Sequence, residues 1–370
     1  MIQASLRDAL LIYRDINRAL KRTATINGRY ATDSRNRSVS KIRFGVLSTA
    51  KIGVEKVIPA MQKGELTEVV AIASRSAEKA RAAAARLGIP NAHGSYEALL
   101  ADPAVGVVYI PLPNDQHVPW SIRALEAGKH VLCEKPIALS AAEACTLAEA
   151  GRKHPRLKLM EAFMYRHHPQ WRKAKELVES GAIGPLRTIQ TFFSHFNEDP
   201  ANIRNDRAMG GGSLMDVGCY PISLSRWLFG AEPRRVLGML EYDSRFQVDR
   251  LTSAVLDFGV GTATFTCSMQ VSPFQQVNVI GTGGRIELSD VPFNAPNDRP
   301  CVVRLQQGSQ ITSLPCEICD QYTIQGDLFA RAILDDGPVP TPIEDAVRNM
   351  ETIDAIVESG RIAAWKAVAK

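Results

Sequence analysis

The chain contains 370 residues, of which 45% are hydrophobic and 22% are charged, and it carries a formal net charge of +5. This length favours two domains, and the composition is ordinary for a globular protein. No run of about 18 or more apolar residues is present, and the N-terminus lacks the apolar core and cleavage site of a secretory signal. We therefore expect a cytoplasmic protein without a membrane partner.

The net positive charge comes from the first 40 residues. Residues 1–40 contain Lys21 and seven arginines against three aspartates, so the rest of the chain balances to zero. An apolar stripe at 4–21 predicts a helix, and 23–40 has the polar composition of a linker. This arm could dock on the body or on a neighbouring subunit, bind an anionic surface, or be an upstream extension; docking is preferred. The balanced body gives no case for nucleic-acid binding.

The seven cysteines are scattered and odd in number, which indicates reduced thiols. Cys316 and Cys319 form one C-x-x-C pair, but no second pair and no spaced histidines accompany it. A structural zinc site needs four such ligands. A zinc or redox role is therefore disfavoured, and we predict no metal site.

Short apolar strands alternate with helical patterns from residue 41 to residue 162. The expected strands are 42–47, 69–73, 105–110, 130–133 and 157–162. The expected helices are 54–61, 77–87, 96–101, 117–127 and 141–152. Apolar strands separated by helices form a parallel sheet that is covered on both faces. Ligands of such sheets bind beyond the carboxyl ends of the strands.

Residues 163–370 follow a different pattern, in which strands succeed one another with short turns between them. The expected strands are 186–194, 234–242, 251–258, 262–268, 275–280, 284–289 and 301–306. The expected helices are 169–180, 322–335 and 343–369. The sequence therefore predicts an α/β protein with three parts: an arm at 1–40, a dinucleotide-binding domain at 41–162, and a second α/β domain at 163–370. The second domain should contain a large, mostly antiparallel open sheet with helices on one face.

The loop after the first strand places small residues where a dinucleotide fingerprint has glycines. Ser48, Ala50 and Gly53 replace the three glycines of G-x-G-x-x-G, and the Ser48 hydroxyl could donate a hydrogen bond. The second strand ends in Ser74-Arg75-Ser76, with no acid before Glu78. Because an arginine suits the 2′-phosphate and an acid suits the free ribose, NADP is favoured over NAD. The alternative for Arg75 is a surface residue at a helix start.

Lys135 follows a buried strand, within Glu134-Lys135-Pro136, at the same rim as the other strand ends. A lysine is rarely placed at the inner end of a strand without a function. Farther along, Asp216 and Tyr220 are four residues apart after three glycines and would share a helix face, although Pro221 should bend the helix. Lys135 would lower the pKa of the Tyr220 phenol, which suggests a set of groups for proton transfer. The alternative is a core tyrosine and an aspartate at a helix start.

Three motifs together resemble the glucose–fructose oxidoreductase/inositol dehydrogenase (Gfo/Idh/MocA) family over nearly all of residues 42–360. They are Leu112-Pro113-Asn114-x-x-His117, Gly128-Lys129-His130-Val131-x-Cys133-Glu134-Lys135-Pro136, and the run from Gly210 to Tyr220. The resemblance implies a Rossmann domain, and a second α/β domain whose sheet often forms the subunit interface. It also implies hydride transfer between NAD(P) and a sugar or other polyol. We accordingly expect a homodimer or homotetramer that is joined through the C-terminal sheet.

The resemblance also implies roles for individual residues. Lys135 and Tyr220 would handle the proton, and Asp216 would hold a sugar hydroxyl. Expected cofactor-binding residues are Ser48, Thr49, Ala50, Ile52, Ser74, Arg75, Leu112, Pro113, Asn114, His117, Glu134, Lys135 and Arg204. Expected substrate-binding residues are Lys135, Arg166, Asp216 and Tyr220.

The substrate class follows from a similarity within the family. Tyr220, the Ser-Thr-Ala loop and the run from Met160 to Arg166 look like the NADP-dependent D-xylose and related aldose 1-dehydrogenases. We therefore expect oxidation of an aldose, of the D-xylose or D-glucose class, at C1 to the lactone. Alternatives are an aldose–ketose or aldose–aldose oxidoreductase that retains its NADP, a dihydrodiol dehydrogenase, and an NADP-binding regulator without catalysis. The retained Lys135, Asp216 and Tyr220 argue against the regulator.

Overall fold

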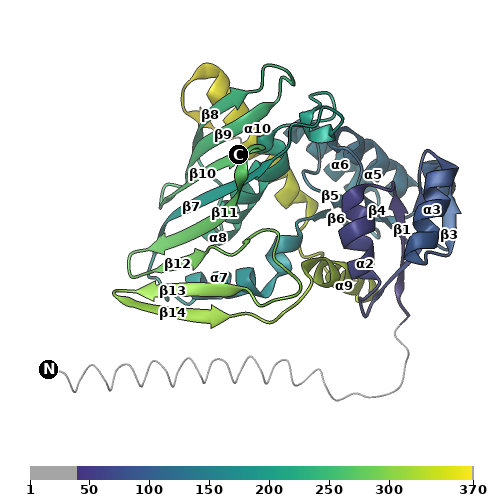
Figure 1. The fold of residues 1–370 in the computed structure, drawn as a ribbon, viewed down its shortest axis with the longest axis horizontal. Coiled ribbons are helices and arrows are strands. Elements are labelled where there is room, and N and C mark those ends of the chain that lie inside the picture. The colour runs from purple at the N-terminus through teal and green to yellow at the C-terminus, as the bar shows by residue number, and fades with distance from the viewer. Residues whose placement is uncertain (1–39, 369–370) are drawn as a thin grey trace, which may run out of the picture. The chain divides into compact units, whose positions relative to one another are not determined.

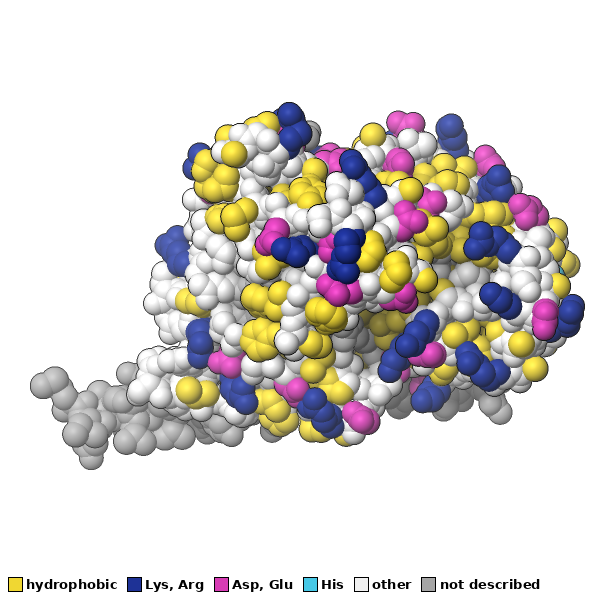
Figure 2. Space-filling model, turned by 45° about the horizontal axis from the view of Figure 1, so that its top comes forward, with side chains coloured by type: hydrophobic (Ala, Val, Ile, Leu, Met, Phe, Trp, Pro, Cys, Tyr) yellow, Lys and Arg dark blue, Asp and Glu magenta, His cyan; other side chains and the backbone are white. Residues whose placement is uncertain are grey.

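Residues 40–368 are described by a computed structural model, which contains two β-sheets with helices packed against them (Figure 1). The helix and linker predicted for the N-terminal arm fall outside these residues, apart from Ser40. Within the described part, no helix is both long enough and apolar enough to cross a membrane. Figure 2 shows Lys and Arg side chains interspersed with Asp and Glu side chains over the face in view, which agrees with the balanced charge of the body.

The N-terminal sheet has six parallel strands in the order β3-β2-β1-β4-β5-β6, the order of a dinucleotide-binding Rossmann sheet. Its strands are β1 Ile42–Leu47, β2 Thr67–Ala73, β3 Asn91–His93, β4 Val107–Ile110, β5 His130–Glu134 and β6 Leu159–Ala162. The sequence predicted every strand of this sheet except β3. That strand is missed because Asn-Ala-His has no apolar pattern and lies at the sheet edge.

Serines set the starts of three helices in this domain. The helices are α2 Ile58–Met61, preceded by a π-helix at Gly53–Val57, α3 Ala77–Leu87, α4 Tyr96–Leu100, α5 His117–Glu126 and α6 Ala141–Lys153. The side chains of Ser76, Ser95 and Ser140 accept hydrogen bonds from backbone N–H groups three residues on. Helix α3 ends at Gly88, which has a φ of 66° that favours glycine. These local signals explain why the predicted helix boundaries agree closely with the structure.

The C-terminal sheet has nine strands in the order β14-β13-β12-β11-β7-β10-β9-β8-β15, and only the β7–β10 pair is parallel. Its strands are β7 Leu186–Phe196, β8 Arg235–Tyr242, β9 Asp249–Asp257, β10 Thr262–Ser268, β11 Gln270–Gly281, β12 Arg285–Leu288, β13 Val302–Gln307, β14 Gln310–Pro315 and β15 Lys366–Ala367. Helices α7 Pro169–Glu179, α8 Cys219–Phe229 and α10 Ile343–Ile362 lie on one side of this sheet (Figure 1). The predicted fold class is confirmed.

The C-terminal end of the chain differs from the prediction. Strand β14 was not predicted, because it is an exposed edge strand without a clear alternation of apolar residues. Helix α10 was expected to continue to residue 369 but ends at Ile362. Ala363 then has a φ of 51°, and Lys366–Ala367 pairs with β8. Formation of this edge pair outweighs the helical propensity of the Ala-rich end.

Helix α9, Gln321–Leu334, crosses from the C-terminal part of the chain to the Rossmann sheet (Figure 1). The Asp327 carboxylate accepts hydrogen bonds from the backbone N–H groups of Glu65 and Leu66. Phe329 is fully buried in the core under β1 and β2. A boundary between residues 162 and 163 therefore does not by itself separate the two sheets, because the Rossmann layer is completed by a helix from the far end of the chain.

Candidate active site

A pocket of about 430 Å³ lies at the carboxyl ends of β1, β2 and β4. Parallel sheets of this strand order bind dinucleotides at this edge. Seven of the predicted cofactor residues line the pocket: Ser48, Thr49, Ala50, Ser74, Arg75, Leu112 and Pro113. Ile52, also predicted, lies partly exposed just beyond the loop. The structure thus brings together residues that are up to 65 positions apart in the sequence.

Ser48 has a backbone conformation that favours glycine, with a φ of 95°. Its hydroxyl donates to the Pro111 carbonyl at 3.1 Å, and its oxygen accepts from the Ala50 N–H at 3.2 Å. The expectation that this hydroxyl is available as a donor to the cofactor is therefore wrong. The hydroxyl proton is used to hold the loop in the shape that a glycine adopts in the usual fingerprint.

Two cations line the pocket at the end of β2. Arg75 was predicted from the sequence, and Lys79, one turn into α3, was missed. Ser74 and Ser76 lie between them and add hydroxyl groups, and the Ser76 side chain also caps α3. Tyr96 forms the neighbouring wall, and Arg75 lies close enough to affect the pKa of its phenol. Two cations and two hydroxyls at a helix N-terminus fit a phosphate on the adenosine ribose.

Lys135 and Asp216 connect the two domains. Lys135 Nζ donates to the Asp216 backbone carbonyl at 2.6 Å and lies 3.4 Å from the Asp216 Oδ1 atom. An ammonium group has three N–H donors, so one is left for a substrate oxygen. The peptide bond between Lys135 and Pro136 is cis. The rim of the Rossmann sheet is in this way connected to the glycine-rich turn of the second domain.

Asp216 accepts hydrogen bonds from two further side chains at its other oxygen. Arg204 Nε lies 2.7 Å from Oδ2, and His195 Nε2 lies 2.9 Å from the same atom. Burial raises the pKa of Asp216, but Arg204 and Lys135 outweigh it and hold this pKa well below the usual range. The carboxylate is thus ionised. Of its roughly four acceptor positions three are used, which leaves one on Oδ1 for a substrate hydroxyl.

His195 belongs to this network but was missed in the sequence. It lies near the end of β7, and 28% of its side chain is exposed, against 12% for Asp216. Arg204, predicted to bind the cofactor, contacts Asp216 instead and is 40% exposed. His195 has no motif around it, and its only sequence signal is its place at the end of a long strand. A strand-end histidine is too common to be selected without the tertiary contact.

Asp249 stabilises the turn that carries Asp216 through hydrogen bonds. A π-helix at Leu214–Gly218 contains Asp216 and leads directly into α8. Asp249 Oδ2 accepts from the Ser213 hydroxyl at 2.6 Å and from the Leu214 N–H at 2.8 Å. Pro221, which was expected to bend the helix, is the third residue of α8, which follows directly on the π-helix, where the regular helical hydrogen-bond pattern is interrupted.

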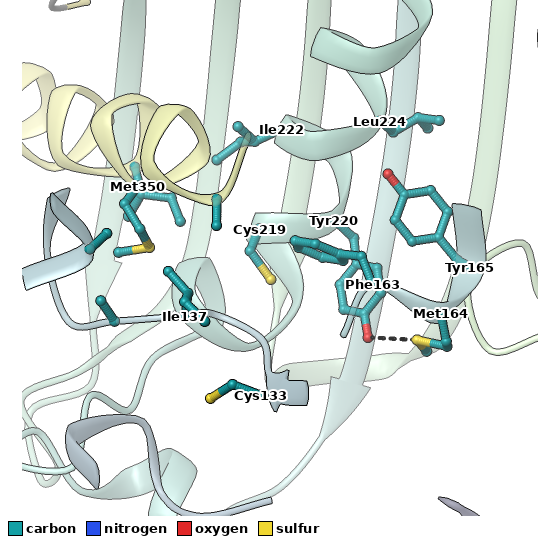
Figure 3. Close-up of a cluster of buried hydrophobic side chains, with 14 of the residues drawn as sticks. Cys133, Ile137, Phe163, Met164, Tyr165, Cys219, Tyr220, Ile222, Leu224 and Met350 are labelled. Atoms are coloured by element: carbon teal, nitrogen blue, oxygen red, sulfur yellow. Dashed lines mark hydrogen bonds between the residues drawn. The ribbon is translucent and has the colours of Figure 1, made fainter. Parts of the chain in front are cut away.

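The predicted pairing of Tyr220 with Lys135 is not the one that the structure contains. Lys135 Nζ lies over the Tyr220 ring, 4.8 Å from its centroid, and the phenol contacts the Met164 sulfur at 3.6 Å. Burial raises the pKa of Tyr220 well above its ordinary value, so the expectation that Lys135 lowers it is wrong. Figure 3 shows the Tyr220 ring packed beside Phe163 and Tyr165, with its oxygen directed at Met164. The alternative of a core-packed tyrosine describes this ring better.

Glu134, predicted to face the cofactor, is held by a tyrosine that the sequence analysis did not select. Tyr109, on β4, donates its phenolic proton to Glu134 Oε1 at 2.7 Å. Burial raises the pKa of Glu134, and the Tyr109 hydrogen bond and Lys135 oppose that shift. The position of Glu134 at the carboxyl end of β5 agrees with the prediction. Its contact with a cofactor stays a prediction.

Asn114 and His117, the polar residues of the Leu-Pro-Asn-x-x-His motif, have different contacts. Asn114 Nδ2 donates to the Gly210 carbonyl at 2.9 Å and so ties the two domains together. His117 is buried, with Nδ1 2.7 Å from the Pro136 carbonyl and Nε2 2.8 Å from the Leu112 carbonyl. Both ring nitrogens therefore contact the backbone. His117 supports the rim through these two contacts, and its contact with a cofactor stays a prediction.

The contacts of Arg166 lie in the interior of the protein. It lies in a short 3₁₀ helix, Met164–His167, and its guanidinium is buried. It pairs with Asp345 at 2.9 Å and donates to the Ser223 hydroxyl at 2.7 Å. These contacts direct it into the interior toward α10, and substrate binding by Arg166 stays a prediction. Within residues 40–368, no group of three or more His, Cys, Asp or Glu side chains is arranged to hold a metal ion.

Two family models match the chain in the regions that form the two sheets. A model described as "Oxidoreductase family, NAD-binding Rossmann fold" matches residues 42–163. A second, described as "GFO/IDH/MocA C-terminal domain", matches residues 171–287. Together they cover more than half of the chain and both halves of the site.

Curated relatives align along nearly their whole length. An uncharacterized oxidoreductase of Rhizobium meliloti is 45% identical over 333 residues, which are 88% of this chain and 99% of the relative. A D-xylose 1-dehydrogenase (NADP(+)) of Haloferax volcanii is 41% identical over 328 residues, which are 87% and 98% of the two chains.

Solved structures agree with these relatives. A 3-ketoreductase from Actinomadura kijaniata, in complex with NADP and TDP-benzene, superposes with a TM-score of 0.81 at 32% identity. The match covers 86% of this chain and 98% of that one. The strand order, the nucleotide pocket and the Lys135–Asp216 contact all lie within the matched regions. The chain therefore belongs to the GFO/IDH/MocA family of oxidoreductases.

Proposed function

We propose that this protein is an NADP-dependent sugar dehydrogenase that oxidises an aldose, of the D-xylose or D-glucose class, at C1 to the lactone. The observation that carries the proposal is the contact of Lys135 with Asp216 beside the nucleotide pocket. The 41% identity to a D-xylose 1-dehydrogenase supports the choice of substrate class. A sugar fits this site because its hydroxyls are both donors and acceptors, which matches a free ammonium donor and a free carboxylate acceptor.

The reaction removes a hydride from C1 and a proton from the C1 hydroxyl. The cofactor, when bound, supplies the hydride acceptor. Lys135 takes the hydroxyl proton as the neutral amine, through the lone pair at the position on Nζ that Asp216 leaves unused, and is left as the ammonium. Asp216 holds Lys135 in place and accepts a hydrogen bond from a neighbouring sugar hydroxyl at Oδ1. Arg204 and His195 keep the carboxylate oriented for both tasks.

The cofactor is NADP. Arg75 and Lys79 supply two positive charges at the end of β2, where an NAD site places an acid. The solved relative binds NADP, and the Haloferax relative is named for NADP(+). Arg75 and Lys79 bind the 2′-phosphate, and the Ser48–Ala50 loop allows close approach of the pyrophosphate.

A second function is the reverse reaction on a keto sugar carried by a nucleotide. The solved 3-ketoreductase has TDP-benzene bound beside NADP, which favours this alternative. Lys135 would then give a proton to the new hydroxyl instead of taking one. An enzyme that retains NADP and cycles it between two sugars, a dihydrodiol dehydrogenase and a non-catalytic regulator remain the other outcomes of the test.

The active protein is a homodimer or homotetramer that is joined through the C-terminal sheet. The outer face of the sheet forms a shallow pocket of about 710 Å³ across β7, β8, β9 and β10. Its walls are outward-facing side chains of mixed polarity, including Phe192, Met239 and Val255. A broad sheet face of this kind can pair with its own copy about a twofold axis.

A panel of aldoses tested with NADP and with NAD decides the function, with reduced nicotinamide followed by absorbance. We expect turnover of a pentose or glucose with NADP, and weaker activity with NAD. Arg75→Ala should raise the KM for NADP at least about tenfold and change that for NAD little, because only NADP carries the 2′-phosphate. Equal effects on both cofactors contradict the phosphate assignment. Activity only with keto-sugar nucleotides and NADPH favours the reductase, and nucleotide binding without turnover of any substrate favours the regulator.

A further inference from the structure

The peptide group that follows Pro136 is held at both ends by buried side chains. Its carbonyl oxygen, on Pro136, lies 2.7 Å from His117 Nδ1. Its N–H, on Ile137, donates to Glu161 Oε1 at 2.8 Å. His117 comes from α5 and Glu161 from β6, on opposite sides of β5 in the chain. The peptide therefore has one orientation that satisfies both contacts, and it lies one residue along the backbone from Lys135.

Glu161 is an unusual residue for a fully buried strand, and it lies on β6 at the edge of the parallel sheet. It stands opposite Cys133 in the β5–β6 register and is buried, with 1% of its surface exposed. Its Oε2 atom has no hydrogen-bond partner among the described residues. A buried carboxylate without a counter-charge lowers the stability of the fold, unless the group is protonated or has a function that justifies this loss. The function described so far does not use this residue.

We propose that Glu161 is a positioning residue for Lys135, which it holds in reach of the substrate and Asp216 by fixing the Ile137 N–H. The inference rests on the proposed function, since Lys135 is there the group that exchanges the proton. Pro136 has no N–H, so Ile137 carries the first backbone donor after Lys135. Figure 3 shows the Ile137 side chain inside the buried cluster with Cys219 and Met350, so the peptide cannot turn to find another acceptor in solvent.

The protonation state of Glu161 affects this contact. Burial raises the pKa of Glu161 to about 8, and Asp345 adds to the shift. Five charged or titratable side chains face Glu161 from the surrounding elements: Asp345 on α10, Arg166 on the 3₁₀ helix Met164–His167, Arg226 and Cys219 on α8, and Cys133 on β5. The two arginines lower the pKa of Glu161, but Asp345 already pairs with both of them. The neutral acid therefore accepts from Ile137 at neutral pH.

The sign of the pH dependence follows from this raised pKa. The folded protein favours the protonated acid, so its stabilising effect is complete below the ordinary pKa of 4.5 and is lost as the pH rises through about 8. Once ionised, Glu161 would need a donor at Oε2, which only a shift toward the arginines or an entering water can supply. The carboxylate is itself the stronger acceptor for the Ile137 N–H, so this contact loosens where the side chain shifts toward the arginines and carries Oε1 away. Turnover should therefore fall, relative to a variant that cannot ionise, as the pH passes 8.

The matched pair Glu161→Gln and Glu161→Ala tests the inference. The glutamine keeps a carbonyl acceptor for Ile137 and cannot ionise, whereas the alanine removes the acceptor. We expect Glu161→Gln to keep kcat within about threefold at pH 7. Glu161→Ala should lose about 100-fold in kcat, with NADP affinity changed less than about twofold, because a misplaced reacting group costs rate before it costs binding. The ratio of kcat between Glu161→Gln and the native enzyme should rise through pH 8.

A control and a readout that needs no substrate keep the outcomes distinct. Asp354→Ala removes another carboxylate, half-buried, that accepts a backbone N–H, from Ala141 at 2.9 Å, and should leave kcat within about twofold. Hydrogen exchange of the segment 134–140 should speed up in Glu161→Ala and stay slow in Glu161→Gln. Unchanged exchange in Glu161→Ala, or faster exchange with full turnover, overturns the inference. If Glu161→Ala does not fold, a flat kcat ratio for Glu161→Gln across pH 8 overturns it. Absence of turnover in the native enzyme contradicts the proposed function, while the exchange data still decide the role of Glu161.

Discussion

Lys135 has contacts that separate its role from that of Tyr220. Its ammonium group donates to Asp216 and lies over the face of the Tyr220 ring, whereas the phenolic oxygen faces the Met164 sulfur. A cation over an aromatic face gains about 1–2 kcal/mol when it is shielded from water. Tyr220 therefore lies as an aromatic wall against Lys135, and in the proposed reaction the atom that exchanges the proton is Nζ.

Two substitutions test this division of roles. Lys135→Ala should lower kcat by about 10²–10⁴-fold, the range typical of a lost acid–base group, with little change in NADP affinity. Tyr220→Phe keeps the ring under Lys135 and should lower kcat by less than about tenfold. Steady-state kinetics with a turned-over sugar measure both, and Tyr220→Leu, which removes the aromatic face, serves as the comparison. A loss for Tyr220→Phe as large as that for Lys135→Ala would assign the proton to the phenol.

The π-helix at Leu214–Gly218 is the element on which the site depends most. It directs Asp216 at Lys135 and is joined to the sheet by Asp249 on β9. Gly212 must be small here, because its φ is 119° and a side chain would collide with the Asp249 carboxylate. Gly212 is thus a requirement of the turn's close approach to the sheet.

Removal of the Asp249 carboxylate should weaken both the fold and the site. Asp249→Ala leaves the Ser213 and Thr252 hydroxyls and the Leu214 N–H without their acceptor, which costs about 3 kcal/mol of unfolding free energy. Chemical denaturation and kcat should both report the loss. Thr252→Val is the control, since it removes only one of the three donors and should cost about 1 kcal/mol. Equal stabilities of the two variants would contradict the supporting role of Asp249.

At the scale of the whole molecule, the two sheets are interlocked by the chain. Helix α9 returns from the second sheet to complete the Rossmann layer through Asp327 and Phe329. Helix α10 joins the parts again, because Asp354 on it accepts from the Ala141 N–H at the start of α6. The Lys135–Asp216 contact lies between these connections. The geometry of the site is therefore determined by how the whole body packs.

The outer face of the C-terminal sheet is where self-association should be tested. Met239 is 66% exposed on β8, within the shallow pocket of that face. Met239→Arg should place like charges opposite each other across a twofold interface and shift the protein toward monomers in analytical ultracentrifugation. Ile311→Arg, at an exposed position on β14 at the other edge of the sheet, is the matched control and should leave the assembly unchanged. An unaltered mass for Met239→Arg would place the interface elsewhere.

Local signals were sufficient for much of this protein. Helix α3 was predicted to the residue, because Ser76 caps its start and Gly88 ends it. The apolar strands and the loop at Ser48–Ala50 identified the nucleotide edge, and the motifs around Lys135 and Asp216 identified the family. Such signals involve residues that are close together in the chain, so they can be recognised from the sequence without the tertiary structure.

Other features depend on contacts between distant residues and could not be read from the chain. His195, Asp249 and Glu161 acquire their roles only from partners on other elements. Arg166 and His117 carry the residue types of a binding site, yet packing directs them to Asp345 and to backbone carbonyls. The sequence determined the fold class and the nucleotide edge and selected Lys135 and Asp216 as site residues, because periodicity and motif spacing are local. The tertiary structure alone decided which polar side chains face the site and which support it, because burial gives a polar group only the partners that the packing brings within reach.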